Sequence, residues 1–331
     1  MRNHEVCARM TGTSPKTSTT FSPVPETSCA RPALHTMQLT VTETLRTRGA
    51  DAYGAEAPVF GRLERAGEVC ATFFFFRIPP GRLNLTPLTP EHADTLAARL
   101  AGLGHPLPGV SAEHDTATAF AEARQRHTDA TPTLRERHRL YRLGTLTPPE
   151  PLPEGRGRLA GEQDRKQLRC WFCEFAAAIG EIPSADADAL ADTRFADRRV
   201  TLWETPDGTP VSMAGMTEMS AGQIRVTPVY TPAHLRGRGY ASAVTVEVSR
   251  AALAAGATEV VLFADLANPT SNSLYQRIGY LPVTDFAAYD FSCDAPEVGE
   301  GLWSVPRRAQ RTRGPPGQSR GRRAPDPAYP R

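Results

Sequence analysis

The sequence predicts an α/β fold built in two parts. Strand-like segments alternate with amphipathic helices through the second half, which is the pattern of a layered α/β structure. The length of 331 residues suits two domains, and 40% hydrophobic with 22% charged residues is the composition of a chain that buries real cores. The strongest apolar run covers only residues 70–76, whereas a membrane helix needs about 18–20, so a membrane protein is excluded.

The two ends of the chain differ in composition from the middle. Residues 1–36 are rich in Ser, Thr and Pro without hydrophobic periodicity, so we expect a disordered tail, with ordered sequence beginning near Met37. The C-terminal segment, from residue 293 to residue 331, loses its pattern and carries eight arginines after Pro306 against one acid, Asp326. We expect a second, solvated tail there; binding to nucleic acid or to an acidic membrane is the alternative.

The charge balance narrows the classes of partner. The whole chain has a formal net charge of +2, so without its arginine-rich end the remainder is net acidic. This does not indicate a nucleic-acid-binding protein, and we expect neither a nucleic-acid nor a membrane partner. The sequence does not specify the oligomeric state.

Cysteine usage and the start of the chain indicate a reducing compartment. Six cysteines are present, but no second close pair matches Cys170 and Cys173, so neither a disulfide framework nor a zinc site is expected. A redox function for that pair would need a strand just before it, and none is predicted. No apolar segment followed by a small-residue cleavage site begins the chain. We therefore expect a cytoplasmic protein with no metal.

The first part, expected at residues 37–144, contains both strands and helices. Residues 58–77 predict a strand, a turn and a strand. Residues 89–103 predict a helix, because Ala93, Leu96, Ala97 and Leu100 share one face. A further helix is expected at 117–126 and a strand at 138–143.

A proline-rich segment separates the two parts. Residues 145–156 contain four prolines, which are incompatible with a helix or a central strand and favour an extended spacer. We expect the domain boundary here.

The second part, expected at residues 157–292, has the strongest pattern. An amphipathic helix at 164–180 places Leu168, Trp171, Phe172, Phe175 and Ile179 on one stripe. The elements that we expect after it are a helix at 185–196, strands at 200–204, 211–217 and 223–230, a helix at 240–255, a strand at 259–264, a helix at 269–278 and a strand at 281–286.

The turn after the strand at 223–230 has the chemistry of an anion site. It reads Arg-Gly-Arg-Gly-Tyr-Ala over residues 236–241 and opens the next helix. The first amides of a helix are unpaired and its dipole is positive there. Gly237 and Gly239 permit a close approach and positive φ, while Arg236 and Arg238 supply charge suited to a diphosphate. The three-glycine dinucleotide pattern and the Walker Gly-Lys-Ser/Thr are both absent.

A second motif follows one helix and one strand later. Asn268, Ser271, Tyr275, Gly279 and Tyr280 have the spacing Asn-x-x-Ser-x-x-x-Tyr-x-x-x-Gly-Tyr. With the arginine–glycine turn, this segment resembles the GNAT superfamily of N-acetyltransferases over about residues 157–290. The span from residue 37 resembles bacterial members in which a degenerate GNAT-like half precedes the working one. The resemblance thus implies a tandem GNAT-like, mixed-sheet α/β fold with a degenerate N-terminal half and no second cofactor there.

The resemblance also implies acetyl-CoA as co-substrate and assigns its contacts. The strand before the turn separates from its neighbour, which suits Pro228, because proline favours edges and bulges. The implied cofactor-binding residues are Val229, Tyr230, Thr231, Arg236, Gly237, Arg238, Gly239, Tyr240, Ala241 and Asn268. Tyr230 could instead line the acceptor channel or close the core. Asn268 also suits a helix N-cap, which is compatible with the first role.

Tyr275 is the implied catalytic acid, because acyl transfer to an amine expels a thiolate that a nearby phenol can protonate. Packing is its alternative role. The general base stays open among Glu204, Glu218 and Asp265.

The sequence thus predicts an N-acetyltransferase that moves an acetyl group from acetyl-CoA to an amine of a small molecule or peptide by direct transfer in a ternary complex. The alternatives are a non-catalytic acyl-CoA-binding or sensor module and a tandem synthase of an acylated small thiol. The acceptor and the acyl-chain preference cannot be predicted.

Overall fold

The computed structural model describes residues 6–11 (backbone only), 36–49, 52, 58–65, 68–75, 81–104, 106–179 and 199–293. All the described residues belong to one compact unit. The helix expected at 185–196 and nearly all of the C-terminal tail lie outside the described residues. No described helix is both long and apolar enough to span a bilayer.

The N-terminal half begins with strands and ends with a long strand. Its elements are β1 (Val6–Thr11), α1 (Thr36–Arg48), β2 (Val59–Arg65), β3 (Glu68–Phe75), β4 (Leu83–Leu85), α2 (Pro90–Gly102), β5 (Gly109–Glu113), α3 (His114–His127) and β6 (Ala130–Leu143).

The C-terminal half follows an irregular segment, as the prolines of residues 145–156 predicted. Its elements are β7 (Arg156–Leu159), α4 (Arg165–Ala178), β8 (Val200–Glu204), β9 (Pro210–Met216), β10 (Gln223–Tyr230), α6 (Tyr240–Ala254), β11 (Glu259–Asp265), α7 (Pro269–Arg277) and β12 (Tyr280–Cys293), with short 3₁₀ turns before α4 and α6.

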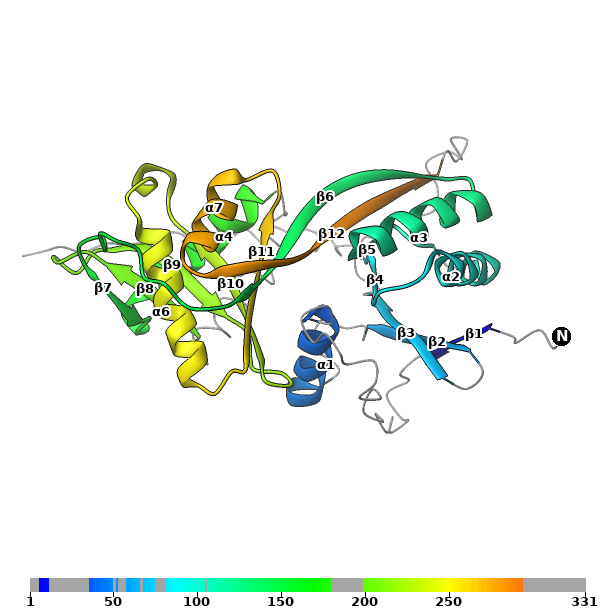
Figure 1. Ribbon diagram of the computed structural model, residues 1–331, viewed down its shortest axis with the longest axis horizontal. Coiled ribbons are helices and arrows are strands. Elements are labelled where there is room, and N and C mark those ends of the chain that lie inside the picture. The colour runs from blue at the N-terminus through cyan, green and yellow to red at the C-terminus, as the bar shows by residue number, and fades with distance from the viewer. Residues whose placement is uncertain are drawn as a thin grey trace, which may run out of the picture. The chain divides into compact units, whose positions relative to one another are not determined.

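Twelve described strands form one mixed sheet in the order β1-β2-β3-β4-β5-β12-β6-β11-β10-β9-β8-β7 (Figure 1). Two neighbouring pairs are parallel, β4 with β5 and β10 with β11, and the other neighbours are antiparallel. Each parallel pair is joined through a helix, as parallel strands require. The predicted α/β fold with a mixed sheet is confirmed.

The two halves exchange their last strands. β6, which ends the N-terminal half, pairs with β11 of the other half, and β12 pairs with β5. The two exchanged strands also pair with each other along almost their whole length, so they lie side by side in the centre of the sheet (Figure 1). Each carries a tyrosine to a helix of the other half: Tyr141 Oη donates to Asn272 Oδ1 at 2.8 Å, and Tyr289 Oη lies 3.1 Å from Thr118 Oγ1.

Separate hydrophobic clusters support the two halves. In the first, the predicted face of α2 is buried against α3 and strands β3 to β5. In the second, α6 and α7 pack with residues of β8 to β11. A third cluster joins α4 to β8, β9 and β10, and its members include Leu168, Trp171, Phe172, Leu202, Met213 and Tyr230. Leu202 and Trp203 are adjacent in β8 yet belong to the third and second clusters, so α4 and α6 cover opposite faces of the sheet.

Most predicted elements are present, and the differences have local causes. Helix α1 was not predicted because its sequence is rich in threonine, a poor helix former. Several of its threonine hydroxyls donate to the carbonyl four residues earlier, as Thr40 and Thr44 do at 2.8 Å. Strands β6 and β12 were predicted as six residues each, but both have 14, since each continues into the other half.

The proline-rich segment is packed against the C-terminal half. Gly144 and Thr147 donate backbone hydrogen bonds to Gly279 O at 2.9 Å and Ile278 O at 3.1 Å. Gly279 has φ of 100°, and a Cβ there would lie only 1.8 Å from Thr145 O. The glycine of the second motif is therefore required by this close backbone approach.

Candidate functional site

Strands β10 and β11 separate partway along their length, as the resemblance implied. Their parallel register has three pairs, of which Arg225 with Val261 is the last. From Val226 onward the described partner of β10 is β9, with an irregularity between Val226 and Val229 that contains Pro228. Proline donates no backbone hydrogen bond, so its presence suits this interrupted ladder. One backbone edge of β10 is thereby left open beside the end of β11.

The loop after β10 leads into an open helix N-terminus. Gly239 is the N-cap residue of α6 with φ of 81°, and it provides no side chain to cap the helix. The first helical bond runs from Ala243 N to Gly239 O at 3.1 Å, so the amides of Tyr240, Ala241 and Ser242 precede it. Such amides, together with the helix dipole, favour an anion.

The two glycines of the loop are required by their backbone conformation and not by crowding from neighbouring atoms. Gly237 has φ of 78°, and a Cβ there would meet nothing within 4 Å. A Cβ on Gly239 would make only ordinary contact, 3.7 Å from Pro153. The left-handed backbone therefore accounts for both glycines, and the space beside Gly237 is open.

The remaining predicted cofactor residues surround this loop. Arg236, Gly237, Arg238 and Gly239 are exposed, while Tyr240, Ala241 and Val229 are partly buried. Arg236 Nε donates to Thr231 O at 3.0 Å, which ties the loop back to the strand end. The carbonyl of Thr231 therefore already has one partner, although a carbonyl oxygen can accept two hydrogen bonds.

Asn268 is the N-cap residue of α7, where its side chain accepts from Ser271 N at 3.1 Å. The side chain is exposed, and the capping bond uses only its oxygen. The N-cap function that the sequence allowed is therefore present. Binding of a cofactor by the same residue stays a prediction.

Tyr275 belongs to a group of three packed tyrosines. Its ring centroid lies 6.2 Å from that of Tyr141 and 6.1 Å from that of Tyr280. The hydroxyls of its neighbours are occupied, Tyr141 with Asn272 at 2.8 Å and Tyr280 with Ser249 at 2.7 Å. The hydroxyl of Tyr275 has no hydrogen-bond partner among the described residues. Burial raises the pKa of Tyr275 to about 12, so its phenol is protonated at neutral pH.

The three candidate general bases lie in different surroundings. Glu204 is buried and paired with Arg156 (Nε to Oε1, 2.7 Å) and Arg158, and the hydrogen bonds from these arginines lower its pKa. Asp265 Oδ1 accepts from Ala267 N at 2.9 Å and thereby shapes the turn before α7. Glu218 is exposed after β9. Glu204 is therefore held in a structural pairing with two arginines, which does not suit a general base.

Two residues that connect the site were not predicted from the sequence. Asn272 is buried, and its Nδ2 donates to Asp265 O and Asn268 O, both at 2.7 Å. Glu174 on α4 accepts from Tyr230 Oη at 2.7 Å. Asn272 could have been found as the residue four after the Asn268 cap. Glu174 gives no such signal, because its partner is 56 residues away.

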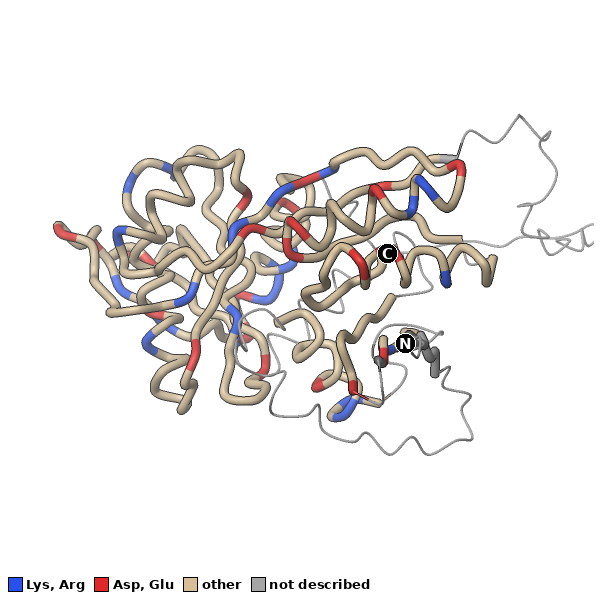
Figure 2. Tube along the Cα trace, turned by 45° about the vertical axis from the view of Figure 1, so that its right-hand side comes forward, with Lys and Arg blue, Asp and Glu red and all other residues tan. Residues whose placement is uncertain are grey.

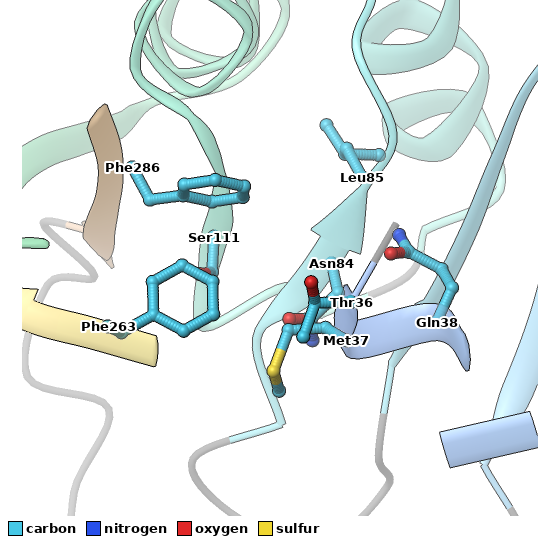
Figure 3. Close-up of a pocket in the computed structure, with 8 residues that line it drawn as sticks. All are labelled: Thr36, Met37, Gln38, Asn84, Leu85, Ser111, Phe263 and Phe286. Atoms are coloured by element: carbon cyan, nitrogen blue, oxygen red, sulfur yellow. The ribbon is translucent and has the colours of Figure 1, made fainter. Parts of the chain in front are cut away.

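A small pocket lies elsewhere, between α1 and the sheet, with the rings of Phe263 and Phe286 on one side and Met37 and Gln38 on the other (Figure 3). It has room for about one water molecule. Its described lining contains no titratable side chain, so it offers no acid–base chemistry.

Positively and negatively charged residues are interspersed along the described chain (Figure 2). Among the described residues, no group of three or more His, Cys, Asp or Glu side chains is arranged to hold a metal ion. His234 is exposed in the loop before α6.

Known proteins share this architecture. The profile of the family described as FR47-like protein matches residues 209–286, which span β9 to β12 and both motifs. No curated protein matches the sequence.

Solved structures match most of the chain. A GCN5-related N-acetyltransferase from Sphaerobacter thermophilus is 18% identical, with 86% of this chain and 94% of that one covered and a TM-score of 0.52. A GNAT-family acetyltransferase from Colwellia psychrerythraea is 12% identical, with 79% and 97% covered and a TM-score of 0.51. A Drosophila protein is 12% identical, with 80% and 90% covered and a TM-score of 0.56. The FR47-like match over residues 209–286 and the shared fold confirm the resemblance to the GNAT superfamily that the two motifs predicted.

Proposed function

We propose that this protein transfers an acetyl group from acetyl-CoA to an amine of a small molecule or peptide, by direct transfer in a ternary complex. The fold supports acyl transfer in general. The observation that carries the finer proposal is the uncapped N-terminus of α6, directly after the point where β10 leaves β11.

The loop and helix suit a diphosphate. The amides of residues 240–242 are free of helical partners, and the left-handed glycines shape the turn that presents them. Arg236 and Arg238 add positive charge beside these amides. The open edge of β10 next to Val229 would bind an amide-bearing chain by backbone hydrogen bonds, as an added strand does. These groups together match the anionic and amide parts of coenzyme A.

Tyr275 supplies the acid. In the transfer, a C–N bond forms between the amine and the acetyl carbon, the C–S bond breaks, and the sulfur leaves as a thiolate. The attacking nitrogen releases one proton to water, while Tyr275 donates its proton to the leaving sulfur and then recovers one from water, so that the products are the amide and the free thiol. Among the three packed tyrosines, only Tyr275 has a hydroxyl without a hydrogen-bond partner in the described residues, so this hydroxyl is available to donate to the substrate.

Two measurements on the full chain test the proposal. Acetyl-CoA should raise the melting temperature, because a ligand at 100 times its dissociation constant adds about 2.7 kcal/mol to the folded state. With acetyl-CoA and a panel of amines, the protein should release free thiol. AMP at the same concentration is the control for nucleotide binding alone.

The sensor alternative makes a different prediction. A non-catalytic acyl-CoA-binding module would be stabilised by acetyl-CoA but would release no thiol with any amine. The absence of both responses would contradict the proposed function and the sensor alternative together.

A further inference from the structure

A buried side-chain amide lies behind the turn that joins β11 to α7. Asn272 of α7 is buried, with 9% of its surface exposed, and its Oδ1 accepts from Tyr141 Oη at 2.8 Å. Its Nδ2 donates to Asp265 O and to Asn268 O, both at 2.7 Å. An asparagine amide has two N–H donors and one acceptor oxygen, and here all of them are engaged. The amide therefore has one orientation, in which it joins the two ends of the turn at residues 265–268.

This turn is also held by its own backbone and by a strand from the other half. Asn268 N donates to Asp265 O at 3.1 Å, and Ala267 N donates to Asp265 Oδ1 at 2.9 Å. Leu266 N donates to Arg137 O of β6 at 3.0 Å. Because β6 supplies Tyr141 as well, the exchanged strand of the N-terminal half supports the turn at two points.

The turn presents the side-chain amide of Asn268, one of the predicted cofactor-binding groups. Asn268 Oδ1 accepts from Ser271 N at 3.1 Å, and its exposed side chain makes no other hydrogen bond to the described residues. The oxygen is thus used for the helix cap, and the Nδ2 group is left as a donor. The carbonyl of the same residue is bonded to Asn272, so Asn272 controls the backbone from which this donor projects.

The N-terminal half has neither the turn nor the amide. Its strand β5 ends at Glu113 and α3 begins at His114, whereas residues 266–268 lie between β11 and α7. Counted from the first helical residue, Ala117 of α3 takes the position of Asn272 in α7. The buried amide is therefore present in the half that has a turn to support, and absent from the half in which we expect no cofactor.

We infer that Asn272 is a positioning residue of the cofactor site: it acts through the turn at residues 265–268 to direct Asn268 toward acetyl-CoA, and Tyr141 holds it in place. This rests on the proposed function and adds to it a task for the N-terminal half, whose strand β6 supports the cofactor site of the C-terminal half. Asn272 is not a catalytic residue, because it contacts only the protein.

A double-mutant cycle on the full chain, measured by calorimetric titration with acetyl-CoA, tests the inference. The first cycle combines Asn272→Ala with Asn268→Ala, and the second combines Asn272→Ala with Arg238→Ala in the separate loop before α6. Asn84→Ala is the matched control, because Asn84 Nδ2 also donates to a backbone carbonyl, that of Arg82 at 3.0 Å, in the N-terminal half. Thermal unfolding checks that each variant is folded at the temperature of the titration.

The expected result is a loss of affinity that depends on Asn268. Asn272→Ala raises Kd for acetyl-CoA about tenfold. In the Asn268→Ala background the same change alters Kd less than about twofold, since the group it acts through is gone, whereas in the Arg238→Ala background the full effect remains. Asn84→Ala leaves Kd unchanged.

A milder variant keeps the test independent of folding. Tyr141→Phe removes one of the three bonds of the Asn272 amide but keeps the buried ring, so it raises Kd by a smaller factor. It takes the place of Asn272→Ala in both cycles if the latter does not fold.

The contrary outcomes are distinguishable. An unchanged Kd in Asn272→Ala and Tyr141→Phe overturns the inference while the proposed function stands. An equal effect with and without Asn268 also overturns it, because the loss then does not pass through the turn, and an equal rise of Kd in Asn84→Ala assigns the loss to general destabilisation. A wild type that does not bind acetyl-CoA contradicts the proposed function itself.

Discussion

The two halves of the chain have the same order of elements around their parallel strands but differ at the start of the helix that joins those strands. In each half, a strand leads into a helix, a parallel strand and a second helix: β4, α2, β5 and α3 in the first, β10, α6, β11 and α7 in the second. At the start of α2, Thr89 caps the helix by accepting from His92 N, and Thr116 of α3 accepts from Leu88 N at 3.0 Å. At the start of α6, Gly239 provides no side chain at all.

This difference teaches what turns a helix start into a binding site. A helix N-terminus always has unpaired amides, and these are satisfied by the chain itself or by something else. At the start of α2 the side chain of Thr89 satisfies one of them, whereas at the start of α6 no side chain does so and two arginines lie in the same loop. The repeated topology supports our interpretation of the N-terminal half as a GNAT-like unit without a cofactor site, which stays a proposal.

The helices that follow the parallel pairs, α3 and α7, also differ in one residue that could take part in catalysis. Counted from the first helical residue, His114 in α3 and Pro269 in α7, Phe120 and Tyr275 occupy the same position. Both are buried, and Phe120 is in the core of its half. The hydroxyl that we propose as the acid is therefore present in one half and absent from the other.

The largest expected effect comes from closing the open helix start. Gly239→Asp places a carboxylate at the N-cap position of α6. The carboxylate accepts hydrogen bonds from the first amides of the helix and repels the phosphates of the cofactor, so the affinity for acetyl-CoA should fall about 100-fold or more. The measurement is calorimetric titration with acetyl-CoA. Gly208→Asp is the matched control, because Gly208 has a similar φ of 84° with open space around it but lies in the β8–β9 turn. Equal losses in both variants would show that backbone strain, not the anion site, is responsible.

Tyr275→Phe makes the C-terminal half resemble the N-terminal one at this position. We expect kcat to fall about 100-fold, within the usual range for loss of a general acid, while the affinity for acetyl-CoA and the melting temperature stay the same. Steady-state thiol release and thermal unfolding measure these quantities. An unchanged kcat would assign Tyr275 to packing, the alternative that the sequence left open.

The exchanged strands β6 and β12 each make one tyrosine contact with a helix of the other half, and these two contacts can be compared directly. Tyr141→Phe removes the hydrogen bond to Asn272 beside Tyr275, and Tyr289→Phe removes the contact with Thr118 in the other half. Each should lower the free energy of unfolding by about 1 kcal/mol, measured by urea denaturation. Only Tyr141→Phe should also lower kcat. A loss of kcat in both would mean that activity depends on the whole sheet rather than on this contact.

The smallest effect is expected at the closed helix start. Thr89→Ala removes the cap of α2 and should cost about 1 kcal/mol of stability, again by urea denaturation. The affinity for acetyl-CoA should not change, because α2 binds no anion in this account. Weaker binding by this variant would show that the N-terminal half takes part in cofactor binding after all.

Much of this comparison could be predicted from local sequence. The hydrophobic stripe of α2 and the strand at 223–230 follow from periodicity, and the glycine-rich turn follows from backbone requirements that a few residues reveal. These features depend on neighbours in the sequence. Both motifs of the site were recognised for the same reason.

What escaped prediction depends on distant partners. The full lengths of β6 and β12 follow from strand exchange, which places polar residues such as those of residues 131–139 in a long ladder with a strand about 150 residues later. Glu174 lies on the polar side of α4 in sequence terms, and only the fold brings Tyr230 to it. The extended spacer was predicted, but its packing against Gly279 was not, because the backbone approach involves residues 145 and 279.

One titration tests the central claim most directly: calorimetry of acetyl-CoA with the wild type and with Arg238→Glu, whose exposed side chain adjoins the amides that open α6. Saturable binding of acetyl-CoA by the wild type, weakened about tenfold or more by the charge reversal, is the predicted result. Equal affinities in the two proteins, or no binding in either, would contradict the assignment of this helix start to the phosphates of coenzyme A.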